Sequence, residues 1–316
     1  MLAGALVAAG LSGAGAAPAC AQDGRFSDSV AVGWVYVPVV VRNDEGYIKD
    51  LRQRDFRLFV DNQPTAVESF ETGAQAPVSI VFLQDLSGSM GAGYKLESSR
   101  EAADFFLDAA RPGDEFALAS FGAGSVQVDV PFTQDAGAAR EAIAAWEAWG
   151  TTALQDAVAW LPEIALERTS LKRAAILITD GLDNASTIPA DKARDLVRKA
   201  QLPVYVLGIE SGSAYDLDDA GKKIYRNADM LNLLAALSGG HYFPISGPDD
   251  LKEACASVLE DLRHQYVLGF STGGGGSARF HPLRVAVDGR NRKVVSFRRG
   301  YTGPAPSVTP AVAGGK

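Results

Sequence analysis

Short apolar runs alternate with helical patterns from residue 76 to residue 263, and this alternation constrains the fold more than any other feature. Residues 78–83 form a nearly continuous apolar run, which is typical of a central parallel strand covered on both faces. The further expected strands are 116–121, 126–130, 174–179, 204–209 and 241–245, with helical spacing around 103–110, 154–164, 193–200, 230–237 and 249–262. This order predicts an α/β fold with a doubly wound, mostly parallel sheet and helices on both faces.

The segments on either side of this unit have strand patterns and no helical pattern. In residues 28–72, Pro38 interrupts an apolar run, which indicates a sheet edge or a bulge. Residues 265–301 contain three further strand patterns separated by glycine-rich turns. Because each segment is too short to bury a core alone, we expect the two to pack together as one small β subdomain. Residues 302–316 are rich in Pro, Ala and Gly and are expected to form a disordered tail.

Residues 1–21 are apolar, rich in small residues and free of charge, which is typical of a secretory signal peptide. The sequence therefore predicts export to the periplasm, the cell surface or the medium. Cys20 also allows a lipid anchor, but Ala17 stands where a lipidation motif favours Leu. No later segment is long and apolar enough to cross a membrane.

Composition and spacing exclude several classes of function. The formal net charge is −8, which disfavours nucleic acid, because phosphates require a surplus of Lys and Arg. The three histidines lack zinc-ligand spacing, and Cys255 stands alone once the leader is removed. The chain has no GxxxxGK[ST] segment to cradle the phosphates of ATP.

Three oxygen-bearing side chains, Asp85, Ser87 and Ser89, follow the first expected α/β strand directly. They lie at the carboxyl end of a central strand, where doubly wound sheets bind ligands. Alternate spacing lets the three converge on one point if the loop is tight, and Gly88 permits the unusual backbone that such a loop needs. The alternative is a plain strand-to-helix turn in which Ser87 or Ser89 caps the helix.

Two distant segments bring further oxygen atoms to matching places. Asp180 closes the apolar run 174–179, and Thr152 opens the helix expected at 154–164. At this point residues 76–263 resemble the von Willebrand factor type A domain family, whose metal-ion-dependent adhesion site pairs a D-x-S-x-S loop with a distant Thr and a distant Asp. The family pattern G-[GT]-T-x-L-x-D-A selects Thr152 over Thr151. Residues 266–270 and 299–301 resemble those of bacterial secreted members of the family.

The resemblance implies a divalent cation, Mg²⁺ in the first place and Mn²⁺ or Ca²⁺ as alternatives. It implies that Ser87, Ser89 and Thr152 bind the ion directly, and that Asp85 and Asp180 act mostly through water. Neutral hydroxyl ligands leave the ion with uncancelled positive charge, which attracts a Glu or Asp carboxylate of a partner protein. Residues expected to support the ligands or to line the rim are Gly88, Asp156, Gly181 and Asp183. For Asp156 a helix N-terminal charge is the competing role, and for Asp183 a plain surface turn.

The sequence thus predicts an exported, non-enzymatic module that uses a metal to bind a protein. One alternative is a structural or assembly protein in which the metal only stabilises the loops. A second is a serine hydrolase, since residues 87–91 nearly match G-x-S-x-G and the chain order Ser89, Asp180, His241 suits a triad. The first glycine of that motif is replaced by Ser87, and the sequence has no HGGG-like oxyanion segment.

Overall fold

The computed structural model describes residues 33–72, 76–122, 125–164, 170–181, 183–199, 202–209, 216–217, 223–224, 226–273, 279–296 and 298–306. The expected signal peptide at 1–21, Cys20, residues 28–32 of the first β segment and residues 307–316 of the expected tail lie outside this description.

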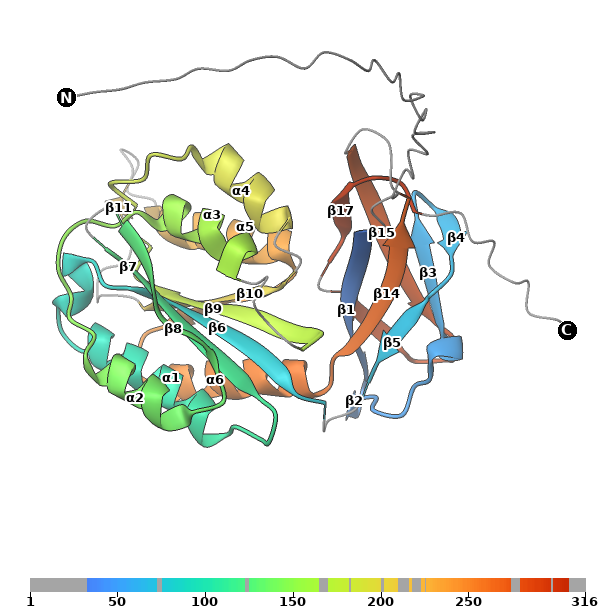
Figure 1. Ribbon diagram of the computed structural model, residues 1–316, viewed down its shortest axis with the longest axis horizontal. Coiled ribbons are helices and arrows are strands. Elements are labelled where there is room, and N and C mark those ends of the chain that lie inside the picture. The colour runs from blue at the N-terminus through green and yellow to red at the C-terminus, as the bar shows by residue number, and fades with distance from the viewer. Residues whose placement is uncertain are drawn as a thin grey trace, which may run out of the picture. The chain divides into compact units, whose positions relative to one another are not determined.

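A six-stranded sheet forms the centre of the α/β domain (Figure 1). Its order is β13 (Tyr242–Ile245), β10 (Val204–Ile209), β9 (Lys172–Thr179), β6 (Val78–Asp85), β7 (Glu115–Gly122) and β8 (Ser125–Thr133). Neighbouring strands run parallel, except that β7 and β8 form an antiparallel edge hairpin. The predicted doubly wound, mostly parallel sheet is confirmed.

Helices cover both faces of this sheet and create two apolar cores. Ile80 and Phe82 of β6 pack into one core, whereas Val81 and Leu83 pack into the other, because successive side chains of a strand point to opposite faces. All eight residues of β6 are buried, as its apolar run predicted. The first core includes α1 (Lys95–Asp108), α2 (Ala136–Ala144) and α6 (Pro248–Arg263), and the second includes α3 (Leu154–Ile164), α4 (Ala190–Lys199) and α5 (Arg226–Ser238) (Figure 1).

The segments before and after the α/β domain pair with each other in two antiparallel sheets. One contains β16 (Lys293–Ser296), β1 (Gly33–Asn43), β14 (Tyr266–Thr272) and β5 (Ser69–Glu71), with β2 (Gly46–Tyr47) beside β1. The other contains β17 (Gly300–Gly303), β15 (Arg279–Val287), β3 (Phe56–Val60) and β4 (Gln63–Thr65). Their inner faces share a third core, which includes Val37, Leu58 and Phe270. The remaining short elements are η1 (Gln53–Asp55), η2 (Gly88–Gly91), β11 (Asp216–Leu217) and β12 (Lys223–Ile224).

Two details of these sheets bear on the sequence predictions. Pro38 lies opposite Val267 of β14, whereas pairing with β16 begins only at Val39, so the missing N–H of Pro38 falls where β1 has one neighbour. Residues 302 and 303 continue β17, and Pro306 forms a bridge with Thr272. Residues 302, 303 and 306 therefore take part in the β structure, whereas the sequence predicted a disordered tail from residue 302 onward.

Helix α6 leads into β14, and its side chains also contact the first β segment. The buried carboxylate of Asp261 accepts hydrogen bonds from Tyr47, at 2.8 Å, and from Arg42, at 2.5 Å. Within the described part of the chain, none of the helices combines the length and the apolar character that a membrane span requires.

Candidate functional site

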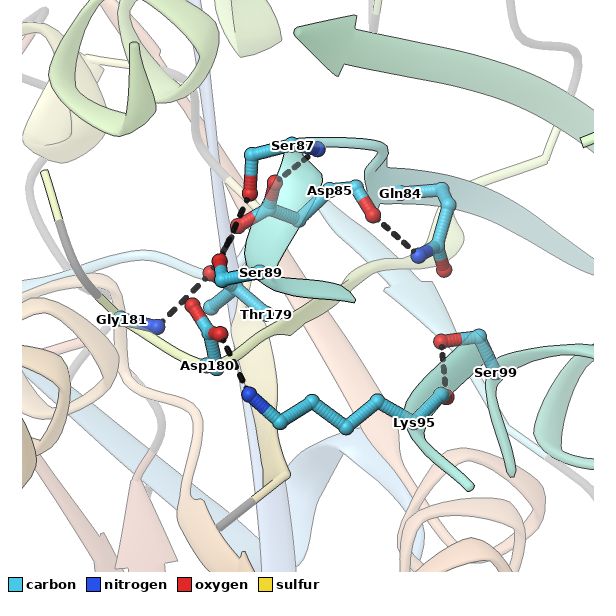
Figure 2. Close-up of polar contacts among 9 residues, drawn as sticks. All are labelled: Gln84, Asp85, Ser87, Ser89, Lys95, Ser99, Thr179, Asp180 and Gly181. Carbon is cyan, nitrogen blue, oxygen red and sulfur yellow. Dashed lines mark hydrogen bonds and ion pairs between the residues drawn. The ribbon is translucent and has the colours of Figure 1, made fainter. Parts of the chain in front are cut away.

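Asp85 ends β6 and is fully buried, and both of its carboxylate oxygens are engaged (Figure 2). Oδ1 accepts a 2.9 Å hydrogen bond from the amide of Ser87, and Oδ2 accepts a 2.6 Å bond from the hydroxyl of Thr179. Burial raises the pKa of Asp85 to about 6, although the hydrogen bonds from Thr179 and Ser87 oppose this rise. The Thr179 hydroxyl also accepts a 3.0 Å bond from the amide of Gly181, whose φ is +81°. The ends of β6 and β9 are thereby joined.

A single 3-10 turn, η2 (Gly88–Gly91), follows β6 and precedes α1; Ser89 lies in this turn and Ser87 directly before it. The Ser87 hydroxyl lies 3.2 Å from the Ser89 hydroxyl rather than on a backbone amide of the turn. Helix α1 begins later, with Tyr94 at its N-cap position. Ser87 therefore occupies the N-cap position of η2 without a capping hydrogen bond from its side chain, and neither serine lies at the N-cap of α1.

The segment that contains Thr152 packs against this turn. The amide of Gly88 donates a 3.0 Å hydrogen bond to the carbonyl of Gly150, and the amide of Trp149 donates a 2.7 Å bond to the carbonyl of Leu86. A Cβ added to Gly88 would lie 3.3 Å from the carbonyl oxygen of Gly150, so the backbone of the turn lies close to the backbone of the Thr152 segment here. Thr152 is 1% exposed, whereas its neighbour Thr151 is exposed. The buried threonine is thus the one that the resemblance selected.

Asp180 follows β9, and its carboxylate is held from one side by a lysine (Figure 2). The Nζ of Lys95 lies 2.7 Å from Oδ2 of Asp180, and the two side chains are 5% and 3% exposed. Oδ1 of Asp180 is also buried and, among the described residues, accepts no hydrogen bond. The sequence predictions missed Lys95. Its position at the start of α1, where the helix dipole disfavours a cation, is the signal that could have drawn attention to it.

Residues just after Asp180 form hydrogen bonds with the backbone of Thr152. The amide of Thr152 donates a 2.9 Å hydrogen bond to Oδ1 of Asn184, and the amides of Asn184 and Ala185 each donate a 3.0 Å bond to the Thr152 carbonyl. Asn184 follows Asp180 in the loop after β9. In the structure it joins the segments that carry two predicted ligands.

Asp183 and Asp156 hold the start of α3 and the chain that packs on it. Oδ2 of Asp183 accepts a 2.9 Å hydrogen bond from the amide of Gln155, in the first turn of α3. The Asp156 carboxylate accepts bonds from the amides of Thr187, at 3.0 Å, and Ile188, at 2.7 Å. Both carboxylates therefore act on backbone amides, and Asp156 supports residues 187–188 rather than Thr152 itself.

The residues present have the chemistry that a hard divalent cation requires. Hydroxyl and carboxylate oxygens are the ligands that Mg²⁺ prefers, in octahedral geometry with retained waters. The unpartnered Oδ1 of Asp180 is a buried acceptor that such an ion or its water would satisfy. In the described part of the chain, three or more His, Cys, Asp or Glu side chains do not gather anywhere in a metal-binding group, so a cation here would depend on the hydroxyls.

The three residues of the hydrolase alternative, Ser89, Asp180 and His241, have other contacts in the structure. The Ser89 hydroxyl is paired with Ser87, and Oδ2 of Asp180 is paired with Lys95. The ring of His241 packs against Tyr205 and Phe243, with centroids 6.2 and 6.4 Å away. None of these contacts joins one of the three residues to another.

Comparisons with known proteins agree with this fold. Residues 80–182 match the von Willebrand factor type A domain family. A solved von Willebrand factor type A protein from Catenulispora acidiphila is 17% identical, with a TM-score of 0.50, and the match covers 87% of this chain and 74% of that one. This likeness concerns the fold alone. The match over residues 80–182 therefore supports a von Willebrand factor type A domain in this chain.

Two other solved structures are similar over a smaller part of the chain. Conserved hypothetical protein BatB from Bacteroides thetaiotaomicron is 21% identical, with a TM-score of 0.47, and the match covers 58% of this chain and 97% of that one. The vWF domain of the type V pili tip protein Mfa5 from Porphyromonas gingivalis is 16% identical, with a TM-score of 0.48, and the match covers 59% of this chain and 95% of that one. No curated protein matches the chain.

Proposed function

We propose that the von Willebrand factor type A domain holds a divalent cation and uses it to capture a carboxylate of a partner protein. Mg²⁺ is the first candidate, with Mn²⁺ and Ca²⁺ as alternatives. Ser87, Ser89 and Thr152 would bind the ion directly, and Asp85 and Asp180 would bind it through water. One observation supports the proposal: the three segments that carry these residues are hydrogen-bonded to one another at one end of the sheet, where Oδ1 of Asp180 is buried and accepts no hydrogen bond from the described residues.

A cation would remove an electrostatic cost that the site carries by itself. Asp85 is fully buried, and burial raises its pKa because an ionised carboxylate loses its hydration there. A bound divalent ion supplies the opposite charge. If its direct ligands are neutral hydroxyls, part of that charge stays uncancelled and is available to an acidic group from outside.

An exposed tryptophan beside the site supports a protein partner. Trp149 is 63% exposed, while its backbone amide is hydrogen-bonded to Leu86 in the loop after β6. Tryptophan side chains contribute strongly to protein interfaces, because they bury a large apolar area with little loss of conformational entropy. We therefore propose that the partner presents an apolar side chain next to its Glu or Asp, and that this side chain packs on Trp149.

Calorimetry on the metal-stripped full chain tests the cation site. We expect wild-type protein to bind Mg²⁺ or Mn²⁺, and Asp85→Ala and Thr152→Ala to bind at least about 10-fold more weakly. Thr151→Ala is the matched control, because Thr151 is the exposed neighbour, and it should bind like wild type. Saturating metal should also stabilise wild type by about 2.7 kcal/mol at 100 times Kd. Absence of both binding and stabilisation in wild type would refute the proposal.

The alternative function, in which the metal only stabilises the loops, differs in its effect on the partner. Under our proposal, a chelator abolishes partner binding, and so does replacement of the acidic residue of the partner. Under the alternative, the metal stabilises the protein while partner binding survives the loss of that acidic residue. Sequencing the N-terminus of the mature chain tests the export predicted from residues 1–21.

A further inference from the structure

The ion pair between Lys95 and Asp180 is placed where an ammonium is costly. Both side chains are almost fully buried, and Lys95 is the first residue of α1, where the helix dipole opposes a positive charge. Taking an ammonium out of water costs several kcal/mol unless a close partner offsets it. The Asp180 carboxylate, at 2.7 Å, is such a partner, and its other oxygen accepts no hydrogen bond from the residues that the structure describes (Figure 2).

We infer that Lys95 is a fixed counter-charge of the cation site. It holds Oδ2 of Asp180, leaves Oδ1 for the cation or its water, and lowers the negative charge that the cation meets. This inference rests on the proposed function, and it adds a residue that decides how strongly the loaded site attracts an anion.

The balance of formal charges gives the direction of the effect. Asp85 and Asp180 carry two negative charges, and Lys95 cancels one of them. A divalent cation then leaves the loaded site with one net positive charge, whereas without Lys95 the loaded site would be neutral. Lys95 should therefore weaken metal binding and strengthen the binding of a carboxylate, since charges act strongly over a few ångströms in a partly buried site.

The competing explanation is an ion pair that serves only the stability of the fold. Lys95→Met separates the two, because Met removes the charge and keeps most of the apolar stem. Calorimetry with Mg²⁺ should show at least about 10-fold tighter binding by Lys95→Met than by wild type. Lys192→Met, at an exposed position of α4, changes the total charge of the chain equally and should bind Mg²⁺ like wild type.

Binding of acetate to the Mn²⁺-loaded protein provides the second measurement. Acetate that displaces water from Mn²⁺ lowers the water-proton relaxation rate, and the midpoint of this fall gives the affinity for a carboxylate. Lys95→Met should require at least about 10-fold more acetate than wild type. In Lys95→Met with Asp180→Asn the ligand set has again one negative charge, so both affinities should return toward wild type.

The stability of the metal-free protein provides a readout without any ion. Lys95→Met leaves the buried Asp180 carboxylate without a cation, so the Tm of this variant should be lower than that of wild type. Mg²⁺ should then raise the Tm of the variant by more than it raises the Tm of wild type. If Lys95→Met does not fold, the single variant Asp180→Asn is compared with the double variant Lys95→Met, Asp180→Asn. In that background, too, loss of Lys95 should tighten Mg²⁺ binding at least about 10-fold.

The outcomes separate this inference from the proposed function. Wild-type protein that binds Mg²⁺, together with Lys95→Met that binds it equally or more weakly, would overturn the role of Lys95 and leave the cation site standing. Wild-type protein that binds no divalent cation would overturn both. Tighter Mg²⁺ and weaker acetate in Lys95→Met, reversed in the charge-balanced double variant, is the result that supports the inference.

Discussion

The hydroxyl of Thr179 donates a 2.6 Å hydrogen bond to Oδ2 of Asp85 and so connects the carboxyl ends of two adjacent parallel strands. Asp85 is fully buried at this point, and its other oxygen accepts the amide of Ser87. The orientation of the Asp85 carboxylate is therefore set by the next strand of the sheet and by its own loop. The position of the serine loop depends on this carboxylate in turn.

Thr179→Val should destabilise the protein, because it removes a donor from a buried carboxylate while keeping the shape of the side chain. We expect the free energy of unfolding in chelator to fall by about 1.5–3 kcal/mol, measured by denaturant unfolding. Thr179→Ser retains the hydroxyl, so its free energy of unfolding should fall much less. Equal stability of Thr179→Val and wild type would mean that the hydrogen bond has no energetic role.

Gly181→Ala should strain the turn that follows Asp180. Gly181 has a φ of +81°, a left-handed conformation in which a Cβ costs about 1–2 kcal/mol. Gly273→Ala is a suitable control, because a Cβ there would have its nearest neighbour at 3.8 Å, an ordinary contact. Thermal unfolding should show a lower Tm for Gly181→Ala and little change for the control. The reverse order would show that the turn relaxes without cost.

Lys172 should make stability depend on pH in the alkaline range. Its side chain is buried, with Nζ 3.3 Å from the carbonyl of Arg263, and burial lowers its pKa from 10.5 to about 8. Below pH 8 the ammonium is charged in both states, so the cost of burying it is fully present. Between pH 8 and 10.5 the unfolded chain keeps a proton that the folded chain has lost, so this contribution to stability rises with pH.

Lys172→Met removes that titration and should be more stable than wild type at pH 7 by about 2–3 kcal/mol. The difference between the two proteins should shrink as the pH rises from 8 to 10.5. Denaturant unfolding at several pH values across this range measures the difference. Subtracting the free energy of unfolding of one protein from that of the other removes the contributions of titrating groups that both proteins share. A difference that stays constant with pH would contradict the lowered pKa.

Trp149→Ala should change partner choice without changing metal binding. Its side chain is 63% exposed and its contact with Leu86 uses the backbone, so stability should change by less than about 0.5 kcal/mol. Peptides selected from a random display library by wild-type protein in Mg²⁺ should carry Asp or Glu beside a bulky apolar residue. With Trp149→Ala the acidic preference should persist and the apolar preference should disappear. Trp160→Ala, at another exposed tryptophan, should select like wild type. If Trp149→Ala and wild type select the same peptides, the partner does not contact Trp149.

The sequence by itself determined the succession of strands and helices in the α/β domain and the positions of the proposed ligands along the chain. The apolar run that became β6 predicted burial on both faces, because only a strand between two helical layers can cover every side chain of such a run. The D-x-S-x-S spacing placed Asp85, Ser87 and Ser89 at the end of that strand. These features are local, so composition and periodicity reveal them.

Only the tertiary structure decided which distant groups meet this loop. The pairing of Lys95 with Asp180, the bond from Thr179 to Asp85, and the support of Thr152 by Asn184 all join segments that are more than thirty residues apart. Each depends on two strands ending at the same edge of the sheet and on a helix or loop that packs over that edge. Spacing along the chain does not encode such pairings, because burial and side-chain direction arise only when the layers pack.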